Sequence, residues 1–401
     1  MGKLIVIVNR YFWPETFLVN YISQWLAEDG HRVTVFTGQP DYNPDAKIPT
    51  QPRRQSWNGV DIKRVSLFRD KGRGIARNLN TQLFTLIAVL QVLFSRDVGA
   101  VWCTTIPPVL QPWLLRLVTK IRGIKFVYFV QDIHPEILIS SQILKTGFIT
   151  KLLRRMDNFT LRNADRVVTI SNDMRELLLS FGANPETCSI IKSFSTEDVD
   201  QPMLGDEDRT GPIDFVFAGN LGQFQNLDAL VEVFAQCDPN LVRLKFLGSG
   251  REKERLQGYV ADQRITNIEF YDVLPANEAF EFVCDCDVGI VTLSKDIYKY
   301  AYPAKTYTYL GAGLPILVFV EEQSELSAIV KDREIGQSIP WEAEHKMQIE
   351  AVMDVANNFN KYRQNVREGT DDLWMQERGR KEWLKLFAYM NATVKPDMRN
   401  G

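Results

Sequence analysis

The sequence has few of the residues that usually hold a metal ion or a disulfide. Its 401 residues include three histidines and five cysteines, and only Cys284 and Cys286 lie close together, as C-x-C rather than C-x-x-C. An odd number of scattered cysteines disfavours a disulfide-linked secreted scaffold and fits a reduced cytoplasmic compartment. Because no His, Cys and carboxylate cluster has the spacing of metal ligands, we expect neither a metal nor another cofactor.

Long apolar runs and nucleotide fingerprints are also missing. The longest apolar stretch, Leu83–Phe94, is too short to span a bilayer and predicts a buried helix. The N-terminal segment becomes polar after Val8, unlike a signal peptide. No G-x-G-x-x-G follows a predicted strand, which argues against a nicotinamide-dependent oxidoreductase.

Charge is distributed unevenly along a chain whose net charge is −3. Between Gln51 and Arg166 there are 19 Lys and Arg but 7 Asp and Glu, and WLLRLVTKIRGIK and KTGFITKLLRRMDNF interleave apolar with basic residues. This pattern is typical of a protein that binds an anionic membrane surface peripherally. Helices that pack on their own sheet and have basic outer faces are the alternative. No nucleic-acid partner is predicted.

Short apolar runs alternate with helix-length amphipathic segments along the whole chain. This alternation predicts an α/β protein whose parallel sheets are covered by helices on both faces. The acidic stretch Ser193–Pro212 has few large apolar residues and predicts a linker, so we expect Rossmann-like domains at 1–192 and 193–373. The predicted strands begin near Leu4, Arg32, Ala100, Lys125 and Arg166, and near Ile213, Val242, Asn267, Asp287 and Pro315.

Glycine-rich turns follow two strands of the second domain. Gly219 and Gly222 flank Asn220 after one strand, and Gly248 and Gly250 follow the next. Ligands of open α/β sheets bind at the carboxyl ends of strands, where glycine turns let backbone N–H groups approach a phosphate. Plain structural turns would explain either motif alone, but two in one domain favour phosphate binding.

The segment AYPAKTYTYLGAGLPILVFV, residues 301–320, predicts a short helix, a glycine turn and a buried strand. Pro303 suits the first turn of a helix, and Gly311 and Gly313 suit its end. Lys305 adds a full positive charge where the helix dipole already favours an anion. A diphosphate is therefore the predicted ligand, and a solvated surface lysine is the alternative.

Asp285-Cys286-Asp287 matches the D-x-D metal motif of one glycosyltransferase class, but here the strand follows the motif instead of preceding it. We therefore expect Asp287 to begin a strand and not to bind a metal.

Five motifs in fixed order resemble the retaining GT-B glycosyltransferases of family 4 over most of the chain. The likeness is greatest to bacterial enzymes of O-antigen, capsule and exopolysaccharide assembly, including N-acetylfucosaminyl-transferase-like members. The motifs are NRYFWPETFLVNYISQWLAEDGHRVTVFTGQPDY, VQDIHPEIL, ADRVVTISNDMRELL, FAGNLGQFQNLDALVEVF and YPAKTYTYLGAGLPIL.

The resemblance implies a GT-B fold, with two Rossmann-like domains facing across a cleft and a helix near residues 374–391 crossing back to the first domain. It implies metal-independent transfer, with retention, from a nucleoside-diphosphate sugar. We expect a UDP-linked N-acetylated amino or deoxy sugar as donor and a polyprenyl-diphosphate-linked or glycan acceptor. A nucleotide-sugar epimerase of the same architecture and a catalytically inactive partner subunit remain alternatives.

The resemblance also implies residue roles. Catalytic roles fall to Glu15, Asp132, His134 and Lys305, and acceptor-side roles to Asn20, Gln131 and Glu136. For Glu136, a carboxylate at a helix start is an equally good interpretation. The implied donor-binding residues are Gly219, Asn220, Gln225, Gly248, Arg251, Asp272, Val273, Leu274, Lys295, Tyr300, Lys305, Thr306 and Thr308.

The chain departs from the family pattern at several of these positions. Tyr300 and Thr308 stand where many members have two glutamates, and Asn220 and Gln225 stand where many have a basic pair. Gln131 replaces a histidine that usually precedes the aspartate, here Asp132. Lys305, with Lys295, is then expected to carry more of the positive charge of the donor site.

Overall fold

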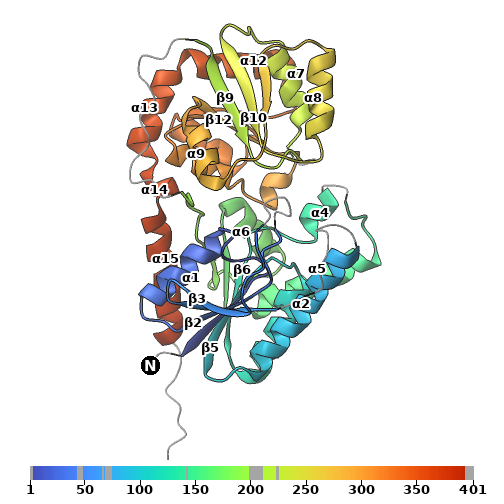
Figure 1. The fold of residues 1–401 in the computed structure, drawn as a ribbon, viewed down its shortest axis with the longest axis vertical. Coiled ribbons are helices and arrows are strands. Elements are labelled where there is room, and N and C mark those ends of the chain that lie inside the picture. Colours follow the sequence, from blue (N-terminus) through green and yellow to red (C-terminus); the bar gives the residue numbers. More distant parts are fainter. Residues whose placement is uncertain are drawn as a thin grey trace, which may run out of the picture. The chain divides into compact units, whose positions relative to one another are not determined.

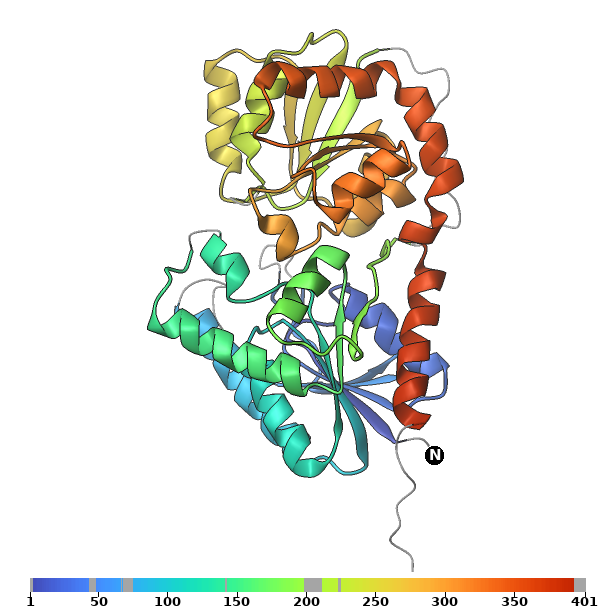
Figure 2. The same ribbon diagram turned by 180° about the vertical axis from the view of Figure 1, so that it is seen from behind.

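A computed structural model describes residues 3–42, 48–65, 67, 75–140, 143–197, 211–222 and 225–392. The chain divides into two compact units: unit 1 comprises residues 1–192 and 377–401, and unit 2 comprises residues 193–376. Helices flank a sheet in each unit (Figure 1, Figure 2). Most of the predicted linker, 198–210, and residues 223–224 of the first glycine motif lie outside the described residues.

Unit 1 is built on an eight-stranded sheet in the order β3-β4-β2-β1-β5-β6-β7-β8, parallel except for the β3–β4 pair. Its central strands are apolar runs with almost no exposed surface, as expected for a sheet covered on both faces. The strands are β1 (Leu4–Val8), β2 (Val33–Thr37), β3 (Arg54–Trp57), β4 (Val60–Arg64), β5 (Val98–Thr104), β6 (Lys125–Phe129), β7 (Arg166–Thr169) and β8 (Cys188–Ile190).

The β3–β4 hairpin at the edge of this sheet was not among the predicted strands. Asn58 and Gly59 form its two-residue turn, and both have positive φ, at 45° and 78°. Asn-Gly between two short strands is the usual sequence of such a turn, because both residues tolerate the left-handed conformation. The local sequence therefore contained the information needed to find this hairpin.

The helices of unit 1 include one that the sequence led us to expect as buried. In α2, Phe84 and Val92 are buried, whereas Leu86, Leu90 and Phe94 are 52%, 51% and 77% exposed. The prediction of a buried helix is therefore wrong for one of its faces. The helices are α1 (Leu18–Glu28), α2 (Ile75–Phe94), α3 (Leu110–Arg122), α4 (Glu136–Ser140), α5 (Phe148–Asn163), α6 (Asn172–Ser180) and α15 (Gln376–Ala392).

The C-terminal helix α15 packs on the sheet of unit 1, as the resemblance implied. The Trp383 ring lies 5.2 Å from Trp102 of β5 and 5.0 Å from Phe129 of β6, centroid to centroid. Phe387, one helical turn later, contacts Trp102 from the same face. These fully buried aromatic rings fasten the end of the chain to unit 1.

Unit 2 contains an all-parallel six-stranded sheet in the order β11-β10-β9-β12-β13-β14. The strands are β9 (Ile213–Ala218), β10 (Val242–Leu247), β11 (Ile268–Tyr271), β12 (Val288–Thr292), β13 (Ile316–Phe319) and β14 (Gly336–Ile339). The helices are α7 (Leu227–Ala235), α8 (Lys253–Asp262), α9 (Ala276–Cys284), α10 (Lys305–Gly311), α11 (Glu325–Asp332), α12 (His345–Asn357), α13 (Phe359–Gly369) and α14 (Asp371–Trp374), with a 3-10 turn at Ile297–Lys299. Parallel sheets with surrounding helices confirm the predicted α/β fold class.

The D-x-D sequence has a structural role in this sheet. Helix α9 ends at Cys284 and β12 begins at Val288, so the motif lies in the turn between them. Asp287 is 5% exposed, and its Oδ2 accepts a 2.7 Å hydrogen bond from the backbone N–H of Asp214. This contact joins the starts of β12 and β9, in agreement with the prediction that Asp287 introduces a strand.

Candidate functional site

The side chain of Lys305 lies at the carboxyl end of β9. Its Nζ is 3.2 Å from the centroid of the Phe217 ring, and a Cβ added to Gly219 would lie 3.9 Å from that Nζ. The amine is buried and makes no hydrogen bond to any residue that the structure describes. The alternative of a solvated surface lysine is therefore wrong.

The electrostatics of this amine favour an anionic ligand. Burial lowers the pKa of Lys305 from 10.5 to about 7, because the charged form loses its water. The face of Phe217 offsets part of that cost through its quadrupole, but a ring face cannot replace hydrogen-bond acceptors. A negative group beside Nζ would supply acceptors and raise the pKa again.

The two glycine turns meet each other at the ends of β9 and β10. A Cβ at Gly248, where φ is +142°, would lie 2.0 Å from the carbonyl oxygen of Gly219, and one at Gly250 would lie 2.3 Å from that of Leu221. Gly248 and Gly250 are therefore required by backbone packing, as the plain structural interpretation proposed. Gly219 differs, because the nearest atom to its missing Cβ is the Lys305 amine. Its backbone is open toward that charge.

Tyr309 holds helix α10 against the end of β9, and the sequence analysis missed it. Its hydroxyl accepts a 2.8 Å hydrogen bond from the backbone N–H of Ala218, and its ring occupies the space where a Cβ on Gly289 would lie 2.3 Å away. The pair of a strand glycine and a helix tyrosine could have suggested this contact. Tyr309 thereby fixes the helix from which Lys305 extends.

Two further predicted donor-binding residues present buried polar atoms near the same loops. Thr306 Oγ1 and Gln225 Oε1 have no hydrogen-bond partner within the described part of the chain. A Cβ on Gly222 would lie 2.8 Å from Asn220 Nδ2 and 3.4 Å from Gln225 Oε1, which places these two amides beside the same turn. The structure thus gathers Gly219, Asn220 and Gln225 after β9.

The remaining predicted donor residues are more exposed. Lys295 is 74% exposed, and its Nζ lies 3.9 Å from Glu342, so its charge is largely solvated. Arg251, Asp272 and Val273 are exposed, whereas Leu274, Tyr300 and Thr308 are half-buried. Of the two lysines expected to share the charge of the site, only Lys305 has a buried amine.

Lys253 fixes the ends of β10 and β11 and was not predicted. Its Nζ donates hydrogen bonds to the carbonyl oxygens of Gly248, at 3.0 Å, and Tyr271, at 2.7 Å, and to Oδ1 of Asp272, at 2.6 Å. The hydrogen bond from Lys253 to Asp272 is the main reason why the pKa of Asp272 is lowered. Lys253 therefore shapes the loops beside the Lys305 site.

In unit 1, two predicted catalytic carboxylates, Glu15 and Asp132, raise the pKa of a tyrosine that the sequence analysis did not single out. Glu15 Oε1 accepts a 2.8 Å hydrogen bond from the backbone N–H of Tyr42. Burial raises the pKa of Tyr42, the nearby Tyr11, Asp132 and Glu15 raise it further, and Arg77 opposes them. Glu15 and Asp132 therefore lie in one electrostatic neighbourhood.

The loop after β6 holds two titratable groups whose pKa values move in opposite directions. Burial raises the pKa of Asp132 to about 6 and lowers the pKa of His134 to about 4. At neutral pH Asp132 is therefore mostly ionised, yet its pKa suits proton transfer, while His134 is neutral. His134 Nδ1 is buried without a hydrogen-bond partner among the described residues, and Gln131 is half-buried beside this pair in the chain.

Two predicted acceptor-side residues are engaged in local structure. Asn20 is 2% exposed; its Oδ1 accepts a hydrogen bond from the Phe17 N–H, and its Nδ2 donates to the Glu15 carbonyl oxygen. It thus caps α1 and shapes the loop that carries Glu15. Glu136, the first residue of α4, accepts a 2.5 Å hydrogen bond from Arg154 Nε of α5, so its helix-start interpretation is supported.

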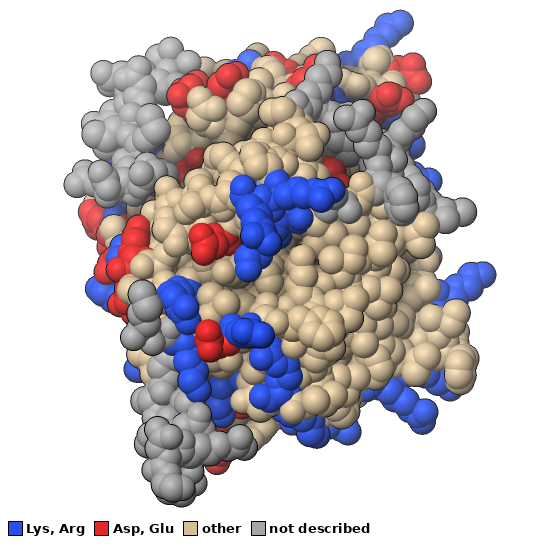
Figure 3. Space-filling view, turned by 60° about the horizontal axis from the view of Figure 1, so that its bottom comes forward, with Lys and Arg blue, Asp and Glu red and all other residues tan. Residues whose placement is uncertain are grey.

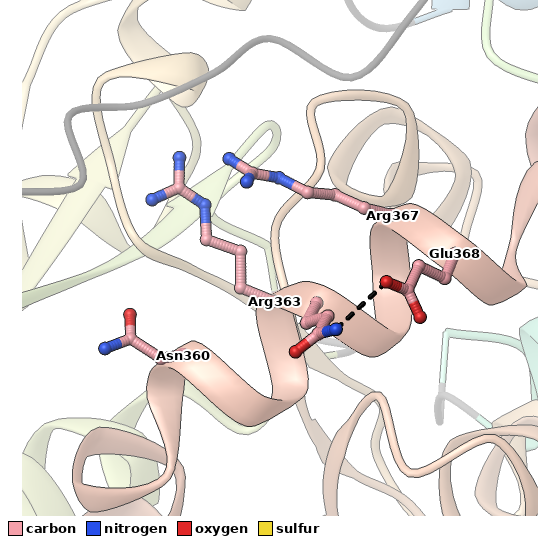
Figure 4. A pocket seen from close by; sticks show the side chains of 5 residues that line it. Asn360, Arg363, Arg367 and Glu368 are labelled. Carbon is pink, nitrogen blue, oxygen red and sulfur yellow. Dashed lines mark hydrogen bonds between the residues drawn. The ribbon is translucent and has the colours of Figure 1, made fainter.

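Other parts of the molecule offer less chemistry. A pocket along α13 is lined by residues outside the predicted site, with a 2.9 Å hydrogen bond from Gln364 to Glu368 and the guanidinium groups of Arg363 and Arg367 on one side (Figure 4).

No group of three His, Cys, Asp or Glu side chains is placed to hold a metal within the described ranges. Nor does any described helix combine the length and apolar character needed to cross a bilayer.

Comparison with known protein families gives a match for much of unit 1. Residues 18–192 match the family model described as "Glycosyl transferase 4-like domain". The chain is 27% identical over 280 residues to the probable glycosyltransferase WbjE of Pseudomonas aeruginosa, covering 68% of this chain and 70% of WbjE. It is 23% identical over 362 residues to the putative colanic acid biosynthesis glycosyl transferase WcaI of Escherichia coli, covering 82% and 85%.

Solved structures show the same fold over nearly the whole chain. The sucrose-phosphate synthase of Thermosynechococcus elongatus matches with a TM-score of 0.73 at 15% identity, covering 97% of this chain and 99% of that one. HepE of Anabaena, solved in complex with UDP-glucose, matches with a TM-score of 0.67 at 10% identity, covering 97% and 100%. At these identities the likeness establishes the fold.

Proposed function

We propose that this chain, which has the GT-B fold, is a glycosyltransferase of family 4 that acts in bacterial polysaccharide biosynthesis. The donor is a nucleoside-diphosphate sugar, UDP-linked, whose sugar is an N-acetylated amino sugar or a deoxy sugar. The acceptor is a polyprenyl-diphosphate-linked or other glycan. The sugar is transferred with retention of its anomeric configuration and without a metal ion.

The buried amine of Lys305 carries this proposal. It lies beside the open backbone of Gly219 without a hydrogen-bond partner among the described residues, and a diphosphate would supply the missing acceptors. Neighbours of the same fold bind such ligands: HepE was solved with UDP-glucose and the Escherichia coli trehalose-6-phosphate protein with UDP-2-fluoro glucose. These two complexes support a nucleotide-sugar as the donor.

The chemistry follows from this charge. The bond between the anomeric carbon and the diphosphate oxygen breaks, and an acceptor hydroxyl oxygen bonds to that carbon on the same face. Negative charge grows on the leaving diphosphate, where protonated Lys305 stabilises it more strongly than in the bound donor. In unit 1, Asp132, with a pKa of about 6, is suited to hold the proton that the acceptor hydroxyl loses.

A lipid-linked acceptor would place the enzyme on the cytoplasmic side of a membrane. The basic and apolar sequence between Gln51 and Arg166 supports a peripheral association with an anionic surface. Two alternatives remain: a nucleotide-sugar epimerase, which shares the two-domain architecture, and an inactive partner subunit, because Tyr300 and Thr308 replace the glutamates found in many members. A nucleotide-sugar epimerase would act without an acceptor, and an inactive partner subunit would show no turnover.

Calorimetric titration of the full chain with nucleoside diphosphates tests the donor site. Lys305→Ala should weaken UDP binding about tenfold to a hundredfold, since a charge-assisted hydrogen bond contributes about 1.5–3 kcal/mol. Lys295→Ala is the matched control, because the Lys295 side chain is 74% exposed and should matter much less. If UDP binds equally well to wild type and Lys305→Ala, the proposed role of Lys305 is wrong.

A further inference from the structure

Exposed apolar side chains are concentrated on a few neighbouring elements of unit 1. Four lie on α2, where Leu79, Leu86, Leu90 and Phe94 are each at least half exposed. On α3, Ile121 is 81% exposed. Helix α3 packs against both α2 and α5, so these side chains belong to one layer of helices. Isolated exposed apolar residues are ordinary on soluble proteins, but such a concentration indicates an interaction surface.

The tip, residues 143–155 around the start of α5, adds four exposed apolar side chains to this surface. Phe148 is 82% exposed, Ile149 65% and Leu152 47%, and Ile143 in the preceding turn is 57% exposed. The opposite face of α5 is anchored in unit 1 through the buried Thr150, Asp157, Thr160 and Leu161. The exposed side chains are therefore held outward by a packed helix, and the tip is not a frayed end.

The charge on the same layer has one sign at the surface. Helices α2 and α3 contain no Asp or Glu, and the single acid of α5, Asp157, is 3% exposed and accepts a 2.8 Å hydrogen bond from Tyr128. Lys120, Lys151, Arg155 and Arg162 are exposed on α3 and α5. Figure 3 shows a wide face of uncharged side chains, with Lys and Arg at several places along its edge and a few Asp or Glu beside those on the left.

We propose that α2, α3 and the tip Ile143–Arg155 form the surface by which this protein docks on an anionic lipid bilayer. Phe148 and Ile149 insert below the headgroups, and Lys151 and Arg155 contact lipid phosphates. The combination of apolar side chains with basic and no exposed acidic residues matches a bilayer interface and disfavours a second copy, whose like charges would repel. This inference rests on the proposed membrane association and deepens it by naming the helices and side chains that make the contact.

The apolar component changes the salt dependence expected from charge alone. An electrostatically held protein leaves vesicles when salt shortens the Debye length, whereas inserted aromatic and aliphatic side chains are insensitive to salt. Binding to anionic vesicles should therefore fall with added salt but level off above zero.

Vesicle flotation of the full chain tests the surface, with phosphatidylcholine vesicles against vesicles that also contain phosphatidylglycerol. Lys151→Gln/Arg155→Gln should weaken binding to anionic vesicles at low salt about tenfold to thirtyfold, since each basic residue contributes about 1 kcal/mol. Phe148→Ser/Ile149→Ser should weaken it about tenfold and abolish the salt-resistant fraction. Leu241→Ser/Met347→Ser is the matched control, because these unit 2 side chains are 48% and 51% exposed.

Equal binding to neutral and anionic vesicles, or equal loss in the control variant, would overturn the proposal. So would sedimentation showing that Phe148→Ser/Ile149→Ser dissolves a dimer without changing flotation, because the surface would then bind a second copy. UDP affinity should be the same in all three variants. A failure of the docking surface is thereby distinguished from a failure of the donor site.

Discussion

Replacing Lys305 by methionine should stabilise the protein while it weakens the binding of the donor. Methionine has a similar length and removes an ammonium that lies buried against Phe217 without a hydrogen-bond partner in the described chain. The buried ammonium therefore lowers the free energy of unfolding of the unliganded protein, and a bound anion would offset this destabilisation. A buried lysine that lowers stability in this way indicates a position where ligand binding, and not stability, explains the presence of the lysine.

The magnitude follows from the pKa of Lys305. Its fall from 10.5 to about 7 corresponds to a cost of roughly 4 kcal/mol at pH 7. The ring face of Phe217 returns about 2 kcal/mol. We expect a net gain of about 2 kcal/mol for Lys305→Met, which raises the unfolding midpoint of unit 2 by about 4–8 °C.

The sign of the pH dependence provides an internal control. Because the folded-state pKa is depressed, the cost is fully present below pH 7 and disappears as the pH rises toward 10.5, where the lysine is neutral in both states. Thermal unfolding followed by circular dichroism should therefore show a large difference between wild type and Lys305→Met at pH 6.5 and a small one at pH 10. An equal difference at both pH values, or a less stable variant, would refute the reasoning.

Three further predictions concern the site. The value of kcat/KM should be highest between pH 6 and 7, because Asp132 loses its charge below about pH 6 and unliganded Lys305 loses its charge above about pH 7. The pH–rate profile of Asp132→Asn should therefore show no fall on the acidic side. Tyr309→Phe should lower the free energy of unfolding by about 1–3 kcal/mol and weaken UDP binding, because the Ala218 N–H loses its acceptor; unchanged denaturation and titration curves would contradict this. Gly248→Ala should lower the free energy of unfolding of unit 2 by more than about 2 kcal/mol in urea, because φ is +142° and the added Cβ would lie 2.0 Å from the Gly219 carbonyl oxygen. Gly258→Ala, whose Cβ would meet no atom within 4 Å on α8, is the control and should be tolerated.

Five strands of each sheet could be predicted because local sequence determines them, whereas β3, β4, β8 and β14 were missed. The runs that form β1 and β6 are apolar on both faces, as is typical of a parallel strand that helices cover on both sides. Both strands begin where they were predicted to begin, at Leu4 and Lys125. The exposed face of α2 could not be predicted in the same way. Its residues are as apolar as those of a buried helix, and only the packing of α3 against one side shows which face is left uncovered.

The sequence predicts those parts of the candidate site that depend on local charge and turn residues. It does not predict the parts that depend on contacts between residues far apart in the sequence. The position of Lys305 after Pro303 suggested an anion site, but its burial depends on Phe217 and Gly219, far away in the sequence. Asn20 was expected to face the acceptor, yet its amide caps a helix, a role set by the path of the loop around it.

The activity that we propose for this protein is the transfer of a sugar from a nucleotide-sugar to an acceptor. The most direct measurement is incubation of the full chain with a panel of UDP-linked sugars, with and without polyprenyl-diphosphate acceptors, followed by mass spectrometry of the lipid and the nucleotide. We predict UDP release and a glycosylated lipid only when donor and acceptor are both present, and a rate at least about tenfold lower for Lys305→Ala. Free sugar and UDP formed without acceptor, or no turnover with any donor, would contradict the account.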